Sequence, residues 1–390
     1  MFCHHNNTTA GVDVFRLGRF FSSRLQDFLS PFLPVLDQLL DKRLVATFAG
    51  LCTSIIRHRS RSTGLVLSEL GGYLLSFDKA PAGTKRISNL LRSKKWSHAV
   101  IADYLAKQAQ QYVDGLLEKQ EQVLLLWDES VQEKAESIKS EGLCAVRSSK
   151  AKRLLRIKPG YYDPPTKKSV HVPGLRWTGL LLCGLKEQPQ IACFKWWTSR
   201  GKHATKLERV RFQLLQWARE QFSTAVLHIF DRGYAGVKWL GLLLAKDDRF
   251  LLRWPSAYKL LDEKGIPKNA YRFSVGKKAT SAKEVWDMKK RCYVERSLLW
   301  MPCLHAAYQQ HPLTLIICRP GKKGRQPWYL LTNEKISSDA DAWKMVHAYA
   351  RRWQIEQSFR FSKSELAMES CRLWFWRPPR GIISSNSCTW

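Results

Sequence analysis

Four side chains of different chemistry follow one another at helical spacing. Tyr349, Arg352, Glu356 and Lys363 are separated by 3, 4 and 7 residues. On an α-helix with about 3.6 residues per turn these steps return to one face. A carboxylate there can bind a metal ion, and the three donors can hold phosphate oxygens. The pattern indicates a phosphodiester site, although Arg352 and Glu356 taken alone are more simply an ordinary ion pair on a solvated helix.

Two aspartates lie where Glu356 would need partners. Asp128 follows the apolar run 122–127, and Asp231 follows the run 224–230. Short continuous apolar runs are typical of strands buried on both faces, so both acids are predicted at strand ends. A single such aspartate is more often a turn or cap residue. Three carboxylates around one point, however, need a cation, and Mg²⁺ or Mn²⁺ would activate a water or a 3′-hydroxyl for phosphoryl transfer.

The bulk composition favours a polyanionic partner. The 390 residues hold 64 Lys and Arg against 33 Asp and Glu, a formal net charge of +31. Nucleic acid is the usual partner of such a chain. A membrane surface or a ribosomal role would also suit the charge, but the 16 Trp favour a folded enzyme with stacking platforms. Residues 1–10 carry no secretory signal, and the longest apolar run, 177–185, is too short to span a membrane.

Cysteine and histidine residues give no sign of a separate metal site. The ten Cys form no CxxC pair, and Cys183, Cys193 and Cys318 lie in apolar runs, which predicts buried free thiols. The Cys3-His4-His5 run lacks a second pair of ligands, so we treat it as chance. His228 lies inside a predicted strand and is expected in the core.

The elements that would position these residues can be predicted from periodicity. Residues 14–115 are expected to be helical, with a basic string KRISNLLRSKKW that either faces DNA or forms a solvated surface. Residues 147–170 are a basic loop, read as a phosphate-contacting strip or a solvated linker. The remaining predictions are a hairpin at 176–198, a helix at 204–222, strands at 250–254 and 328–332, and a helix from about 337 to 366 with cap candidates at its start.

Taken together, these motifs resemble those of a known family. The Tyr-x2-Arg-x3-Glu-x6-Lys signature is matched at every position, and the strand with Asp128 and the block Asp231-Arg232-Gly233-Tyr234 look like the first two catalytic acids of the same family. These features resemble the cut-and-paste insertion-sequence transposases of the DDE superfamily, specifically the insertion-sequence-four group. The resemblance covers about residues 85–375.

The resemblance implies an α/β fold, in which a β-rich insertion interrupts an RNase H-like catalytic core and a helical N-terminal domain precedes it. The expected domains are a helical DNA-binding domain at 1–115, the first part of the core at 116–254, the insertion at 255–325, the second part of the core with the signature helix at 326–376, and an aberrant tail at 377–390.

It also implies site roles. Asp128, Asp231 and Glu356 would hold two Mg²⁺ ions, with Mn²⁺ as a substitute. Tyr349, Arg352 and Lys363 would grip phosphates at the transposon end, and a flipped base would stack on Trp353 or Trp328; core packing is the alternative for both tryptophans. No nucleotide-binding loop is present or needed.

The implied reaction is cut-and-paste DNA transposition through a hairpin intermediate. The expected partners are double-stranded DNA, as terminal inverted repeats and target DNA, and a second subunit in a homodimer on DNA. The expected location is the cytoplasm of a bacterium or archaeon, at the nucleoid.

The sequence departs from the family after Lys363. Only 27 residues follow, and residues 377–390 lack helical periodicity, which suggests a frame change or truncation. An alternative is therefore a catalytically inactive, truncated transposase that only binds DNA. A third possibility is an RNase H-like nuclease acting alone.

Overall fold

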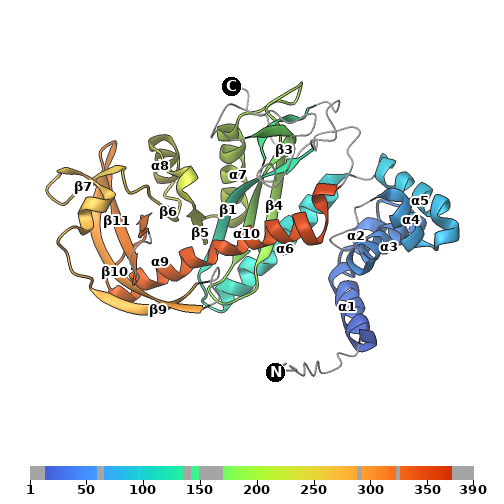
Figure 1. Ribbon diagram of the computed structural model, residues 1–390, viewed down its shortest axis with the longest axis horizontal. Coiled ribbons are helices and arrows are strands. Elements are labelled where there is room, and N and C mark those ends of the chain that lie inside the picture. The colour runs from blue at the N-terminus through green and yellow to red at the C-terminus, as the bar shows by residue number, and fades with distance from the viewer. Residues whose placement is uncertain are drawn as a thin grey trace, which may run out of the picture. The chain divides into compact units, whose positions relative to one another are not determined.

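The computed structural model describes residues 14–58, 66–95, 97–134, 142–148, 170–287, 292–321 and 326–370. The chain forms two compact units (Figure 1). The helical unit comprises the chain up to Tyr104 together with Phe361–Arg372, and the sheet unit contains Leu105–Arg360. Residues 3–5, most of the basic loop 147–170 and the tail 377–390 lie outside the described residues.

The described residues between 14 and 115 are mostly helical, as predicted. The core of the helical unit gathers Phe32, Leu36 and Leu90, which are at most 4% exposed. Two helices meet at Gly71 and Gly83, where a methyl group on either residue would collide with the backbone of the other helix. The helices are α1 (Val14–Leu29), α2 (Leu33–Asp37), α3 (Lys42–His58), α4 (Leu67–Leu74), α5 (Ala80–Arg92) and α6 (His98–Glu118), the last of which ends in the sheet unit.

The sheet unit is built on one large sheet. Its described strands run in the order β2-β3-β1-β5-β6-β12-β11-β10-β7-β8, with β4 on β3 and β9 on β10. β1, β5 and β6 are parallel neighbours, and the other pairs are antiparallel. The strands are β1 (Val123–Glu133), β2 (Cys144–Arg147), β3 (His171–Cys183), β4 (Gln190–Trp197), β5 (Val226–Phe230), β6 (Phe250–Arg253), β7 (Lys259–Leu261), β8 (Pro267–Asn269), β9 (Ser281–Asp287), β10 (Cys292–His305), β11 (Tyr308–Pro320) and β12 (Trp328–Thr332).

Most predicted elements are present. β3 and β4 form the expected hairpin, with Arg176 opposite Trp197. The 255–325 region is rich in strands as expected, and these strands continue the same sheet because β12 pairs with both β11 and β6.

The prediction that Asp128 ends a strand is wrong. β1 extends from Val123 to Glu133, and Asp128 lies within it. Pairing with β3 continues from Leu124 to Glu133, which keeps the backbone extended beyond the apolar run. Only the parallel pairing with β5 ends early, at Leu126 and Ile229.

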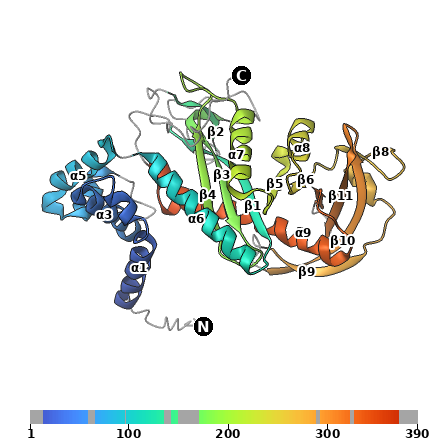
Figure 2. The same ribbon diagram turned by 180° about the vertical axis from the view of Figure 1, so that it is seen from behind.

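Alternation along the strands sorts their side chains onto two faces. Leu125 and Trp127 face a core shared with α6, α7 (Leu207–Phe222) and α8 (Val237–Leu244). The opposite face carries α9 (Asp339–Arg351) and α10 (Trp353–Arg360), where Phe359 stacks on Trp177 at 4.7 Å between ring centroids. Figure 1 shows α9 and α10 in front of the sheet, and Figure 2 shows α6 in front when the molecule is turned.

The signature helix is interrupted once. α9 ends at Arg351, Arg352 forms a turn, and α10 continues into a π-helical turn at Phe361–Glu365. The predicted cap is confirmed, since the Ser338 side chain accepts a hydrogen bond from the backbone N–H of Asp341.

Two predictions about buried residues are confirmed. His228 is 1% exposed and accepts a hydrogen bond at Nδ1 from the Trp127 indole at 3.1 Å, and burial lowers its pKa to about 3. Cys183, Cys193 and Cys318 are buried free thiols.

Within the described ranges, none of the helices has the length and apolar character needed to cross a membrane.

Candidate active site

The strand register brings the two predicted aspartates level. Leu126 of β1 pairs with Ile229 of β5, and Asp128 and Asp231 each follow two residues later. Two residues is one full period of a strand, so both side chains lie on the face that carries α9 and α10. Asp231 directly precedes a short 3-10 turn, Arg232–Tyr234.

Tyr349 of α9 braces Asp231. Its hydroxyl donates a hydrogen bond to Asp231 Oδ1 at 3.1 Å, and the residue is 4% exposed. The Trp328 ring packs edge-to-face against it, with 5.1 Å between ring centroids. Burial and the charge of Asp231 raise the pKa of Tyr349 to about 12, so the phenol remains a donor at neutral pH. In the protein without DNA, the Tyr349 hydroxyl is therefore bound to the Asp231 carboxylate.

Arg352 and Glu356 form an ion pair one helical turn apart. The side chains are 12% and 31% exposed, so the pair lies partly inside the protein and is not the solvated surface pair of the simpler alternative. The same guanidinium acts on the two aspartates, because its charge lowers the pKa of both Asp128 and Asp231. One cationic side chain therefore counters three carboxylates.

The two aspartates differ in their electrostatics. Burial raises the pKa of Asp128 to about 7; the negative charges of Glu356 and Asp231 add to the rise, while Arg352 opposes it. Burial also acts on Asp231, but Arg352, the Arg232 backbone, the Tyr349 hydroxyl and Arg253 outweigh it and lower its pKa. Asp231 is consequently charged at neutral pH, while the Asp128 carboxyl exchanges a proton there.

Arg253 is a site residue that the sequence analysis missed. It ends β6, whose Leu252 pairs with Phe230, so it comes level with Asp231. Its Nη1 atom is 3.9 Å from Asp231 Oδ1. The only signal in the sequence was a basic residue in the apolar run 250–254, and that signal gains meaning only once β6 is known to lie beside β5.

The remaining predicted residues are distributed between the units. Trp328 is half-buried, with the Arg296 guanidinium 4.1 Å from its ring centroid. Trp353 is half-buried at the start of α10. Lys363 lies in the π-helical turn, belongs to the helical unit, and has its Nζ 3.8 Å from Glu369.

The three carboxylates have the right chemistry to bind a divalent cation, but their side chains are not arranged around one point. Carboxylate oxygens are the ligands that Mg²⁺ and Mn²⁺ prefer. Among the residues that the structure describes, however, no group of three or more His, Cys, Asp and Glu side chains is placed to hold one ion. Glu356 is turned to Arg352, whose charge stands in for that of a cation.

Part of the chain matches a known family model. Residues 200–376 match the family model described as a transposase DDE domain, a stretch that includes Asp231 and Glu356. No curated protein matches the chain. Among solved structures the chain is similar to the cryo-EM structure of a piggyBac transposase synaptic complex with hairpin DNA, at 14% identity and a TM-score of 0.41. The alignment covers 84% of this chain and 60% of that one, so this chain spans less than two thirds of that transposase. The match shows similarity to a transposase DDE domain over this stretch.

Proposed function

We propose that this chain is a cut-and-paste transposase of an insertion sequence, of the insertion-sequence-four type with an RNase H-like core, and that Asp128, Asp231 and Glu356 are its catalytic carboxylates. The observation that carries the proposal is the parallel register of β1 and β5, which brings two acids level beneath the helix that bears the third. The family match, which includes two of the three acids, supports it.

In this proposal the three carboxylates hold Mg²⁺ or Mn²⁺, which when bound supplies the positive charge that activates an attacking water or 3′-hydroxyl. Tyr349 fixes the orientation of Asp231, since its hydroxyl donates to Oδ1. Arg253 and Arg352 lie within reach of the acids and offer guanidinium donors to phosphate oxygens. Without the metal ion the pKa of the Asp128 carboxyl is about 7, so binding of the ion near neutral pH would displace its proton.

Arg352 has to change partners when DNA arrives. Its guanidinium pairs with Glu356 in the free protein. A phosphodiester competes for the same donors, and its binding would release the Glu356 carboxylate. Substrate binding therefore completes the carboxylate set, which limits cleavage by the free enzyme.

Trp328 and Trp353 are proposed to stack a flipped base in a hairpin step. Lys363, in the helical unit, is proposed to contact a DNA phosphate. Trp328 is suited to the stacking role because Arg296 covers its ring at 4.1 Å and holds it in place. An aromatic face then offers a base about 1–3 kcal/mol of stacking.

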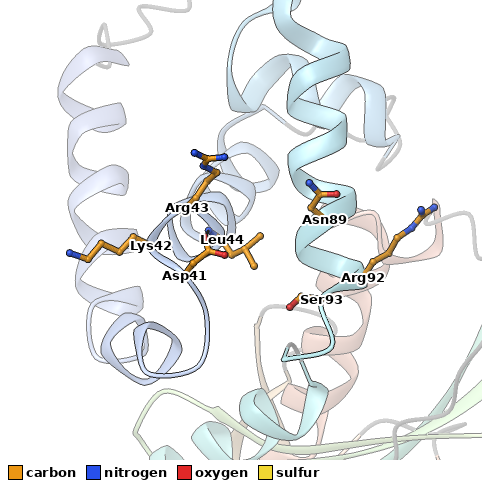
Figure 3. Close-up of a pocket in the computed structure, with 7 residues that line it drawn as sticks. All are labelled: Asp41, Lys42, Arg43, Leu44, Asn89, Arg92 and Ser93. Atoms are coloured by element: carbon orange, nitrogen blue, oxygen red, sulfur yellow. Dashed lines mark hydrogen bonds between the residues drawn. The ribbon is translucent and has the colours of Figure 1, made fainter.

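The helical unit is proposed to bind the DNA backbone. An open groove of about 790 Å³ lies between the start of α3 and the end of α5 (Figure 3). Asp41 Oδ1 accepts the Leu44 N–H at 3.0 Å and so caps α3. Three cationic side chains of the groove could bind DNA phosphates, namely Lys42, Arg43 and Arg92. The lining residues are Asp41, Lys42, Arg43, Leu44, Asn89, Arg92 and Ser93.

The proposed substrates are terminal inverted repeats and target DNA, bound by a homodimer in the cytoplasm at the nucleoid. The test incubates the full chain with double-stranded DNA that carries the ends flanking its gene, in Mg²⁺ and in Mn²⁺. We expect end-specific nicking and hairpin formation, each abolished by Asp128→Asn, Asp231→Asn and Glu356→Gln, and unaffected by Glu284→Gln at an exposed acid of β9.

The outcomes separate the alternatives. End binding without cleavage in either metal ion would identify a catalytically inactive, DNA-binding form. Cleavage with no preference for the ends would identify a nuclease acting alone. Cleavage that survives all three carboxamide variants would refute the assigned site.

A further inference from the structure

A cluster of an arginine, a glutamate and a tyrosine lies on the other face of the sheet, behind the two aspartates. Arg211 of α7 donates a hydrogen bond from Nε to Glu129 Oε1 at 2.7 Å. Its guanidinium carbon is also 3.9 Å from the centroid of the Tyr234 ring. We call Arg211, Glu129 and Tyr234 the Arg211 clamp.

The clamp reaches the residues next to both acids. Glu129 follows Asp128 in β1, so its side chain points to the opposite face, and its backbone hydrogen-bonds the Asp128 carboxylate. Tyr234 ends the 3-10 turn that Asp231 begins and is 4% exposed. It packs on Phe230, with 5.1 Å between ring centroids. Arg211 therefore connects the strand that carries one aspartate with the turn that carries the other.

Backbone pairing does not perform this task. The parallel ladder between β1 and β5 ends at Leu126 and Ile229, before either aspartate is reached. Beyond that point β1 is held by β3, while the chain after β5 enters the 3-10 turn. Direct backbone pairing between the two strands therefore stops short of both aspartates, and the clamp is a side-chain connection that spans this gap.

We propose that Arg211 is a positioning residue that sets the distance between the two catalytic aspartates. The proposal rests on the proposed function, because it concerns the same carboxylates. Arg211 acts on them through Glu129 and Tyr234. A guanidinium suits this role because its planar fork binds a carboxylate along the edge while its face lies on an aromatic ring. An ammonium group keeps the charge and loses the planar geometry.

The variant that tests this is Arg211→Lys, with Arg209→Lys on the exposed side of the same helix as the matched control. Mn²⁺ binding to the DNA-bound full-length chain is measured by electron paramagnetic resonance, together with the metal dependence of end cleavage and the unfolding temperature. We expect Arg211→Lys to weaken Mn²⁺ binding by about 10- to 100-fold, as other outer-sphere substitutions do, and to leave DNA binding unchanged. Arg209→Lys should behave like the wild type.

A purely structural role gives a different result. Arg211→Lys would then lower the unfolding temperature and leave Mn²⁺ affinity at the wild-type value, which would overturn the proposal. If Arg211→Lys does not fold, Glu129→Gln keeps the shape of the clamp and removes the charge of the carboxylate; weaker Mn²⁺ binding is expected there too, and wild-type affinity would equally overturn the proposal. Failure of the wild type itself to bind Mn²⁺ or cut DNA would count against the proposed function, not against the clamp.

Discussion

The raised pKa of Asp128 predicts an unusual dependence of stability on pH. The folded protein shifts this pKa from its ordinary value of 3.8 to about 7, chiefly by burial. Because the folded state binds the proton more tightly than the unfolded chain does, ionised Asp128 opposes folding. This cost begins as pH rises above 3.8 and is fully present above pH 7. Asp128→Asn should therefore stabilise the metal-free protein at neutral and alkaline pH.

The size of the effect follows from linkage. The change in pKa from 3.8 to about 7 corresponds to about 4 kcal/mol in the free energy of unfolding above pH 7. Roughly 2–3 kcal/mol of this accumulates between pH 5 and pH 8, and the partial exposure of the carboxyl puts the expected value near the lower figure. The stability advantage of Asp128→Asn over the wild type should grow by that amount across this interval.

Urea unfolding followed by tryptophan fluorescence, in EDTA at pH 5 and pH 8, measures this difference. Asp231→Asn is the matched control. Its carboxyl has a lowered pKa, so its charge stabilises the fold above the unfolded pKa and is lost only as pH falls through the folded value. Asp231→Asn should be less stable than the wild type by a similar margin at both pH values. An Asp128→Asn advantage that is equal at pH 5 and pH 8 would refute the argument.

Three further predictions concern ligands. Arg352→Gln removes the side chain that pairs with Glu356, so without DNA the variant should bind Mn²⁺ more tightly than the wild type while losing cleavage; equal Mn²⁺ affinity in calorimetry would contradict the exchange of partners. Trp328→Ala should reduce base flipping, read as 2-aminopurine fluorescence at the transposon end, whereas Trp328→Phe should retain most of it; an unchanged signal in Trp328→Ala would assign the ring to packing alone. Arg43→Gln with Arg92→Gln should weaken end binding and lower the slope of log affinity against log salt by about 1 for each phosphate that the variant no longer neutralises, and an unchanged slope would remove the groove from the DNA interface.

Local patterns were enough to predict many elements. The apolar runs before Asp231 and around 250–254 correspond to β5 and β6, and the run 328–332 corresponds to β12. Helical periodicity predicted α7 and the signature helix, and the Ser338 cap was correct. These features depend on residues close together in the chain, so hydrophobic period and capping chemistry determine them. The same spacing put Arg352 and Glu356 one turn apart, and they do meet.

Only the tertiary structure decided what surrounds the acids. The length of β1 depends on its pairing with β3, about 50 residues away, so the apolar run alone placed the strand end too early at Asp128. Arg253 lies near Asp231 because β6 pairs with β5, and Arg211 reaches Glu129 because α7 packs on the sheet; no local pattern encodes either arrangement. The charge states of Asp128 and Asp231 likewise follow from burial and from the guanidinium of Arg352, which is distant in the sequence. Residue types and spacing determined which groups were available for chemistry, whereas long-range packing decided their neighbours and hence their charge, because electrostatic energies depend on distance and burial in space.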